Sequence, residues 1–136
     1  MADSNDFNSR IIEEFRANNG HVGGSMDVLL LHHTGARSGA QRVNPLAYQS
    51  IGEGYAVFAS KAGAPTNPAW FHNLIAHPDA TVEVGTETVR VRARVAEPTE
   101  RDVIYARQAE RVPQFAKYEE SAAPRKIPVV VLDPVK

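Results

Sequence analysis

The sequence predicts a mainly β protein of the α+β class, a small antiparallel barrel of six strands with helices at its periphery. Six short segments have the apolar or alternating pattern of strands, and short turns separate most of them. The helical segments are inserted among these strands instead of alternating with them, which argues against a parallel βαβ sheet. Closure into a barrel would leave no exposed strand edges.

The length and composition indicate one domain and exclude several kinds of chemistry. We divide the 136 residues into an amino-terminal amphipathic helix, residues 1–20, and a barrel domain, residues 21–136. The chain has no cysteine, which excludes disulfides, thiolate nucleophiles and cysteine-ligated metals. Its formal net charge of -1 argues against a general nucleic-acid binder, which needs a basic surface.

The apolar runs of the chain are too short to cross a membrane. The longest of them, residues 28–31 and 129–132, have the length of strands. The first six residues are polar and acidic, unlike a signal peptide. We therefore expect a cytoplasmic protein.

The amino-terminal helix is predicted from apolar residues at helical spacing, namely Phe7, Ile11, Ile12 and Phe15. Asn5 or Asp6 is a candidate cap, residues 19–20 a candidate end, and Gly23-Gly24 a joint to the barrel. Because the apolar face is short and its charges are mixed, we expect it to pack on the barrel and not on a membrane.

The predicted strands have two kinds of pattern. Continuous apolar runs indicate buried strands. The alternation of valine with arginine near residue 90 indicates a strand with one buried and one solvent-exposed face. The strands are expected at residues 28–33, 42–49, 55–60, 81–84, 88–96 and 127–132. Pro45 interrupts the second of these and indicates an edge or a bulge.

Three further helices are expected between or after the strands. Asn67 is a candidate cap for a helix that has Pro68 at its first position and runs to residue 76. Thr99 and Asp102 resemble a capping box for a helix over residues 101–111. A short helix is expected over residues 114–122.

Two segments have the composition of an anion site. The loop at residues 34–42 combines glycines, Arg37, Arg42 and hydroxyl residues, which together suit a phosphate cradle. The segment at residues 59–68 places Lys61 before a helix start, where free N–H groups attract anions. The alternatives are a plain hairpin turn for the first segment and an ordinary strand-to-helix connection for the second.

The remaining candidate chemistry is sparse. Trp70 and Asn73 lie three residues apart on one helix face and suit the wall of a flat ring system, although Trp70 also suits a core position. The five histidines are not spaced as metal ligands, so no metal site is expected. No serine has a partnered histidine in a known motif. We therefore expect a bound cofactor to perform the reaction.

Three long stretches resemble the deazaflavin-dependent nitroreductase family of actinobacteria. They are residues 29–48, which contain His32-His33-Thr34-Gly35-Ala36-Arg37-Ser38-Gly39, residues 59–78, and residues 127–134. The resemblance implies the split β-barrel shared with flavin-mononucleotide oxidoreductases. It also implies coenzyme F420, a phosphorylated deazaflavin, as the cofactor.

The resemblance also implies roles for individual residues. Those expected to hold the cofactor phosphate and tail are Thr34, Gly35, Arg37, Ser38, Gln41, Arg42 and Lys61. Those expected along the deazaflavin ring and its edge are Pro45, Leu46, Tyr48, Ala59, Ser60, Ala62, Gly63, Asn67, Trp70 and Asn73. The acceptor side is expected at Val112, Phe115 and Tyr118. The proton would come from Tyr118, Tyr48, Ser60 or water.

The expected activity is hydride transfer from reduced F420 to a small acceptor: a quinone, an enone or a nitro compound. Some relatives carry tyrosine where Val112 and Phe115 stand, which leaves activity on nitroimidazoles open. A flavin-mononucleotide enzyme on the same barrel and a non-catalytic F420 carrier are the alternatives. Either a monomer or a homodimer fits the sequence.

Overall fold

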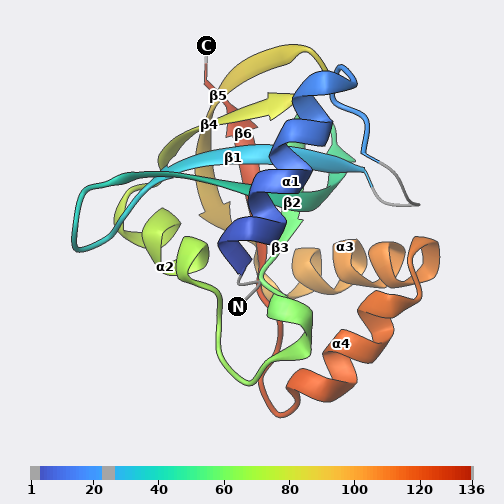
Figure 1. Ribbon diagram of the computed structural model, residues 1–136. Coiled ribbons are helices and arrows are strands. Elements are labelled where there is room, and N and C mark those ends of the chain that lie inside the picture. The colour runs from blue at the N-terminus through green and yellow to red at the C-terminus, as the bar shows by residue number, and fades with distance from the viewer. Residues whose placement is uncertain (1–3, 23–26, 136) are drawn as a thin grey trace.

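The computed structural model describes residues 4–22 and 27–135, with side chains from residue 8 onward (Figure 1). The expected joint Gly23-Gly24 lies outside the described residues. The strands are β1 Val28–Thr34, β2 Gln41–Ile51, β3 Gly54–Phe58, β4 Asp79–Val84, β5 Glu87–Val95 and β6 Val129–Pro134. The helices are α1 Ser4–Ala17, α2 Ala69–Ala76, α3 Pro98–Arg111 and α4 Gln114–Ala122, with a 3-10 turn η1 at Lys61–Gly63.

The strands close into a barrel in the order β1-β2-β3-β6-β5-β4, and every neighbouring pair is antiparallel. The predicted six-stranded antiparallel barrel is therefore confirmed. Strand β2 pairs with β1 over its first part and with β3 only from Tyr48 onward. Pro45 lies opposite Leu30 in the part of β2 that pairs with β1 alone, so one edge of the strand is open there. Proline suits an open edge because it has no N–H to donate to a neighbouring strand.

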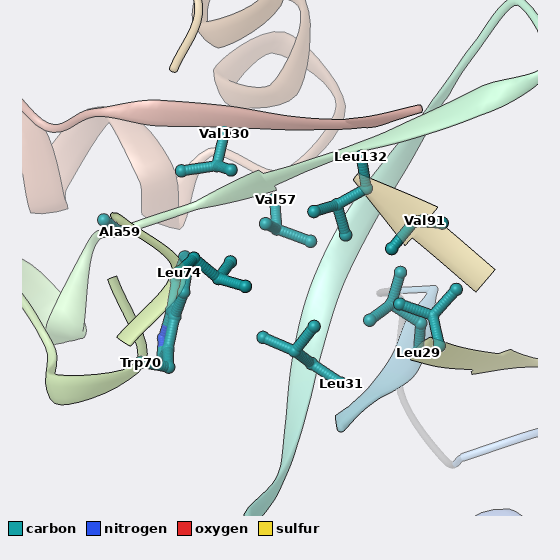
Figure 2. Close-up of a cluster of buried hydrophobic side chains, with 10 residues drawn as sticks. Leu29, Leu31, Val57, Ala59, Trp70, Leu74, Val91, Val130 and Leu132 are labelled. Carbon is teal, nitrogen blue, oxygen red and sulfur yellow. The ribbon is translucent and has the colours of Figure 1, made fainter. Parts of the chain in front are cut away.

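The barrel interior is one of two hydrophobic cores. Alternate residues of the strands fill it, because successive side chains of a strand point to opposite faces. Trp70 and Leu74 of α2 pack into this interior beside Leu31 and Val57 (Figure 2). Helix α2 thereby joins the barrel core, and its position relative to β1 and β2 is fixed.

The second core lies on the outer side of β3 and β6, where α3 and α4 cover the barrel (Figure 1). Its centre is aromatic: the ring centroids of Phe58 and Phe115 are 5.3 Å apart, and those of Phe58 and Tyr105 are 5.9 Å apart, both edge to face. This core holds α4 against the barrel.

Helix α1 crosses the barrel over β1 and β2 (Figure 1). Phe15 is only 2% exposed, and the guanidinium of Arg16 donates to the Glu83 carboxylate at 2.8 Å. That bond, together with one from His32, lowers the pKa of Glu83. The helix therefore packs on the barrel. None of the described helices is long and apolar enough to span a membrane.

Three helix starts differ from the sequence predictions. Helix α1 begins at Ser4, ahead of the expected caps. Helix α2 begins at Ala69 with Pro68 at the cap, because the side chain of Asn67 accepts a hydrogen bond from Arg125 instead of capping the helix. Helix α3 begins at Pro98, where proline suits the first turn, and the capping box predicted from Thr99 does not form.

Candidate functional site

A large cavity lies between two loops, the start of β2 and helix α2. The first loop comprises residues 35–40, between β1 and β2, and the second loop comprises residues 59–67, between β3 and α2. The cavity has a volume of about 1110 Å³, above the usual range for a small-ligand site. The predicted cofactor residues that line it are Gly35, Arg37, Ser38, Arg42, Leu46, Lys61, Ala62, Trp70 and Asn73.

The cavity wall is strongly basic. Arg37, Arg42 and Lys61 line it, and no aspartate or glutamate is among the described residues that do. The whole chain carries a formal net charge of -1, so this concentration of cations is local. Cations gathered in a cleft raise the local concentration of anions. The arrangement therefore favours a large anionic ligand.

Strand β2 contributes one face to the cavity. Arg42, Asn44 and Leu46 follow one another at alternate positions and all line it. Pro45 lies on the opposite face by the same alternation. Gln41, at the strand start, donates from its amide nitrogen to the Thr34 hydroxyl at 3.1 Å, which closes the base of the first loop.

A chain of hydrogen bonds among residues of the cavity wall ties the first loop to β2 and α2. The Ala36 backbone N–H donates to Asn73 Oδ1 at 2.8 Å. Asn73 Nδ2 lies 3.1 Å from His33 Nδ1, and His33 Nε2 lies 2.7 Å from Asn44 Oδ1. We call this set of four residues the relay. It connects the first loop, α2, β1 and β2.

The direction of every bond in the relay follows from its backbone end. Because the Ala36 N–H only donates, the atom of Asn73 that faces it is the oxygen, and its NH₂ group faces His33. His33 Nδ1 therefore accepts, and the ring proton is on Nε2, which donates to Asn44. Burial of the ring, which is 2% exposed, lowers the pKa of His33 and favours this neutral form.

Arg125, from the segment after α4, holds the second loop. Its guanidinium donates to the carbonyl oxygens of Ala59, Ser60 and Ala64 and to the side chain of Asn67, with distances from 2.6 to 3.1 Å. Desolvation lowers the pKa of Arg125, which nonetheless stays cationic. One side chain thus binds backbone carbonyl groups on both sides of the turn η1.

The backbone of the second loop has an unusual conformation. Ser60 is right-handed helical, whereas Lys61, Ala62 and Gly63 have φ values of 47°, 53° and 82°. A right-handed residue followed by a left-handed one makes a concave group of N–H donors that binds anions. A Cβ on Gly63 would lie 2.8 Å from Ser121 Cβ, so the turn packs closely on α4. Glycine is required at this position.

Several predicted site residues do not line the cavity. Those of β1, β2 and the two loops that are not among the lining residues include Thr34, Gln41, Pro45, Ala59, Ser60, Gly63 and Asn67. Among the proposed proton donors, Tyr48 packs edge to face on Tyr55 with centroids 5.7 Å apart, and burial raises its pKa. Tyr118 packs on Phe115 with centroids 5.4 Å apart.

The predicted acceptor residues Val112, Phe115 and Tyr118 belong to the second core or pack against it. Phe115 is 3% exposed between Phe58 and Tyr105. Phe115 is therefore a core residue in this structure, and its expected position at the acceptor side stays a prediction.

The sequence prediction missed other residues of the site. His33, Asn44, His72 and Asn8 line the cavity, and Arg125 acts from outside it. Asn44 was accessible to sequence reasoning, since strand alternation places it on the same face as Arg42 and Leu46. Arg125 was not, because it lies some sixty positions from the carbonyls that it binds. In the described part of the chain, no group of three or more histidine, aspartate or glutamate side chains is placed to hold a metal ion.

Comparison with known proteins shows which family and which solved structures the chain is similar to. The model of the F420H(2)-dependent quinone reductase family matches residues 8–134. An F420H(2)-dependent quinone reductase of Mycobacterium tuberculosis H37Rv is 39% identical over 127 residues, which is 87% of this chain and 83% of the relative. A solved F420-H2 dependent reductase, FDR-A, has a TM-score of 0.71 at 34% identity and covers 78% of this chain and 93% of its own. A second solved structure, described as a domain-swapped dimer, has a TM-score of 0.74 at 31% identity and covers 96% of this chain and all of its own.

Proposed function

The chain belongs to the F420H(2)-dependent quinone reductase family, and from this membership we propose that the basic cavity holds reduced coenzyme F420 while hydride passes to a quinone. The fold is the split barrel of F420-dependent reductases, the protein is an oxidoreductase, and its cofactor is F420. The proposal concerns where the cofactor lies in this chain and which acceptors the enzyme takes.

The basic wall is the observation that carries the proposal. F420 has a phosphate and an acidic tail, and the cavity offers Arg37, Arg42 and Lys61 without an opposing carboxylate among its described lining residues. Forked arginine donors and the concave N–H group at Lys61 suit phosphate oxygens. The residues present therefore fit the cofactor.

When bound, reduced F420 supplies hydride from C5 of its deazaflavin ring. The protein contributes binding and orientation. In this proposal Arg37, Arg42 and Lys61 hold the anionic part, while Leu46 and Trp70 give the ring an apolar wall. Delivery of a proton by Tyr118, Tyr48 or Ser60 stays a prediction. Because none of the three lines the cavity, we favour water as the source.

The acceptor class is proposed more broadly than the family name. Quinones are flat and mostly apolar, so they need shape complementarity more than a polar clamp. Enones and nitro compounds accept hydride by similar chemistry, and we propose both as slower substrates. A bicyclic nitroimidazole should be reduced less efficiently than menadione.

Two measurements on the purified protein test the proposal. Titration with oxidised F420, followed by fluorescence quenching, should show a Kd of about 1 μM or lower, near -8 kcal/mol. Single-turnover mixing of the reduced complex with menadione should oxidise the cofactor. Tight retention of flavin mononucleotide without a response to F420 would support the flavin alternative. Binding without turnover would support a carrier.

Assembly and location are proposed separately. We propose a monomer or a homodimer, and the solved relative described as a domain-swapped dimer supports the second state. A cytoplasmic location also stays a proposal. Sedimentation measurements at several protein concentrations distinguish the two assemblies.

A further inference from the structure

The relay leaves one of its hydrogen-bond donors, at the cavity wall, without a partner among the described residues. Asn44 lines the cavity, and its Oδ1 is taken by His33 Nε2 at 2.7 Å. Its amide nitrogen has no hydrogen bond to any described residue, and it is not among the buried polar atoms left without a partner. This nitrogen therefore belongs to a residue of the cavity wall that lies between Arg42 and Leu46 on the same face of β2.

The geometry points to Asn44 as a ligand-binding residue of the cavity: its amide nitrogen, held in place by His33, donates a hydrogen bond to a carbonyl or similar acceptor oxygen of the cofactor. This inference rests on the proposed F420 site and adds a contact to it. His33 is a positioning residue, since it acts through Asn44 and Asn73.

The relay makes this orientation obligatory. A flip of the Asn44 amide would place its NH₂ group against the Nε2–H of His33, so two donors would face each other. Moving the ring proton to Nδ1 would instead oppose the NH₂ group of Asn73. Flipping Asn73 as well would oppose the backbone N–H of Ala36, which cannot change. Only one arrangement satisfies all three bonds, and it presents the nitrogen of Asn44 to the cavity.

A proton on His33 therefore breaks the relay. With both ring nitrogens protonated, Nδ1 faces the NH₂ group of Asn73 and the bond to α2 is lost. The charged or titratable groups that act on the ring are His32 beside it on β1 and Arg42 on β2. Those that line the same cavity are His72 on α2 and Arg37 and Lys61 on the two loops. Both His32 and Arg42 disfavour the charged ring. Acid should thus weaken cofactor binding through this residue.

The test compares the wild type with three variants by F420 titration from about pH 5 to about pH 8, the range in which histidine titrates. Asn44→Asp keeps the oxygen that His33 binds, removes the donor and turns a carboxylate oxygen to the cavity. His33→Gln keeps an amide donor for Asn44 but does not titrate. Asn18→Asp, in the exposed turn that follows α1, adds the same charge at a residue that does not line the cavity and serves as the control.

We expect Asn44→Asp to raise the Kd for F420 about tenfold or more at pH 8. The decrease in F420 affinity at acid pH should also begin at a higher pH in this variant, because a carboxylate beside Nε2 stabilises the charged ring. His33→Gln should lose the decrease in affinity at acid pH, so its Kd for F420 should not change between about pH 5 and about pH 8. Asn18→Asp should match the wild type throughout.

Wild-type affinity in Asn44→Asp, with its melting temperature unchanged, would overturn the role of Asn44. If that variant does not fold, His33→Gln provides the test. An F420 affinity that still decreases at acid pH as in the wild type would overturn the role of the relay. Failure of the wild type to bind F420 would overturn the proposed function and this inference together. Binding by the wild type with no effect in either variant overturns the inference alone.

Discussion

The two loops that line the cavity are held by different means. The first loop is fixed by neutral groups, the amides and the imidazole of the relay, which link Ala36 to Asn73, His33 and Asn44. The second loop is fixed by one cation, Arg125, which binds backbone carbonyls from outside the cavity. The first support can be protonated at acid pH, below the ordinary pKa of histidine, whereas the second stays cationic. Acid should therefore disturb one wall of the site and leave the other intact.

The largest effect is expected for Arg125→Met, which removes the support of the second loop. It leaves the carbonyls of Ala59, Ser60 and Ala64 without their donor, so the free energy of unfolding should fall by about 2–4 kcal/mol. F420 affinity should fall about tenfold or more, because Lys61 loses its fixed backbone. Urea denaturation and F420 titration measure the two quantities. Arg107→Met, at an exposed position of α3, is the control and should change neither.

A pair of glycine variants compares the backbones of the two loops. Gly63→Ala combines strain at a φ of 82° with a clash against Ser121, and should cost about 2–3 kcal/mol of stability. Gly39→Ala has a φ of 70° but open space around the added carbon, so about 1 kcal/mol is expected. Equal melting temperatures for the two variants would contradict the close packing of the second loop on α4.

The charges of the two loops should contribute separately to cofactor binding. Arg42→Ala and Lys61→Ala should each weaken F420 binding by about 1.5–3 kcal/mol, the range for hydrogen bonds to charged groups. The losses should shrink as salt increases. Lys117→Ala, on an exposed part of α4, provides the control. Wild-type affinity in both cavity variants would move the anion site elsewhere.

Phe115→Tyr distinguishes a core position from an acceptor site. Because the ring is enclosed by Phe58 and Tyr105, the added hydroxyl should lower stability by about 1–3 kcal/mol. The ratio of kcat/KM values for menadione and a nitroimidazole should not change. A shifted ratio at unchanged melting temperature would return Phe115 to the substrate side.

The smallest effect concerns pH and the first loop. The pKa of His33 is lowered from its ordinary value of 6.5 by burial, so the unfolded chain takes up this proton first as pH falls. Stability is therefore complete above about pH 6.5 and declines as pH falls through the lowered pKa. The difference in unfolding free energy between wild type and His33→Gln should narrow over that window. A constant difference would mean that His33 does not titrate there.

Local patterns in the sequence predicted the barrel well, because each strand carries its own apolar period and its own turns. They also predicted the basic loops, since Arg37, Arg42 and Lys61 stand beside glycines. What they did not predict depends on contacts between distant segments. Arg125 reaches a loop some sixty positions away, and it recruits Asn67, which by local rules would cap α2. Phe115 has the same sequence character whether it faces a core or a substrate.

The central claim is that cations of both loops bind the anionic part of F420, and a double-mutant cycle of binding affinities tests it most directly. Wild type, Arg42→Ala, Lys61→Ala and the double variant are titrated with F420 and with the same deazaflavin lacking its phosphate and tail. We expect the wild type to bind F420 far more tightly than the shortened deazaflavin. The double variant should bind the two ligands with almost equal affinity. Equal affinity of the wild type for both ligands, or an undiminished preference in the double variant, would contradict the claim.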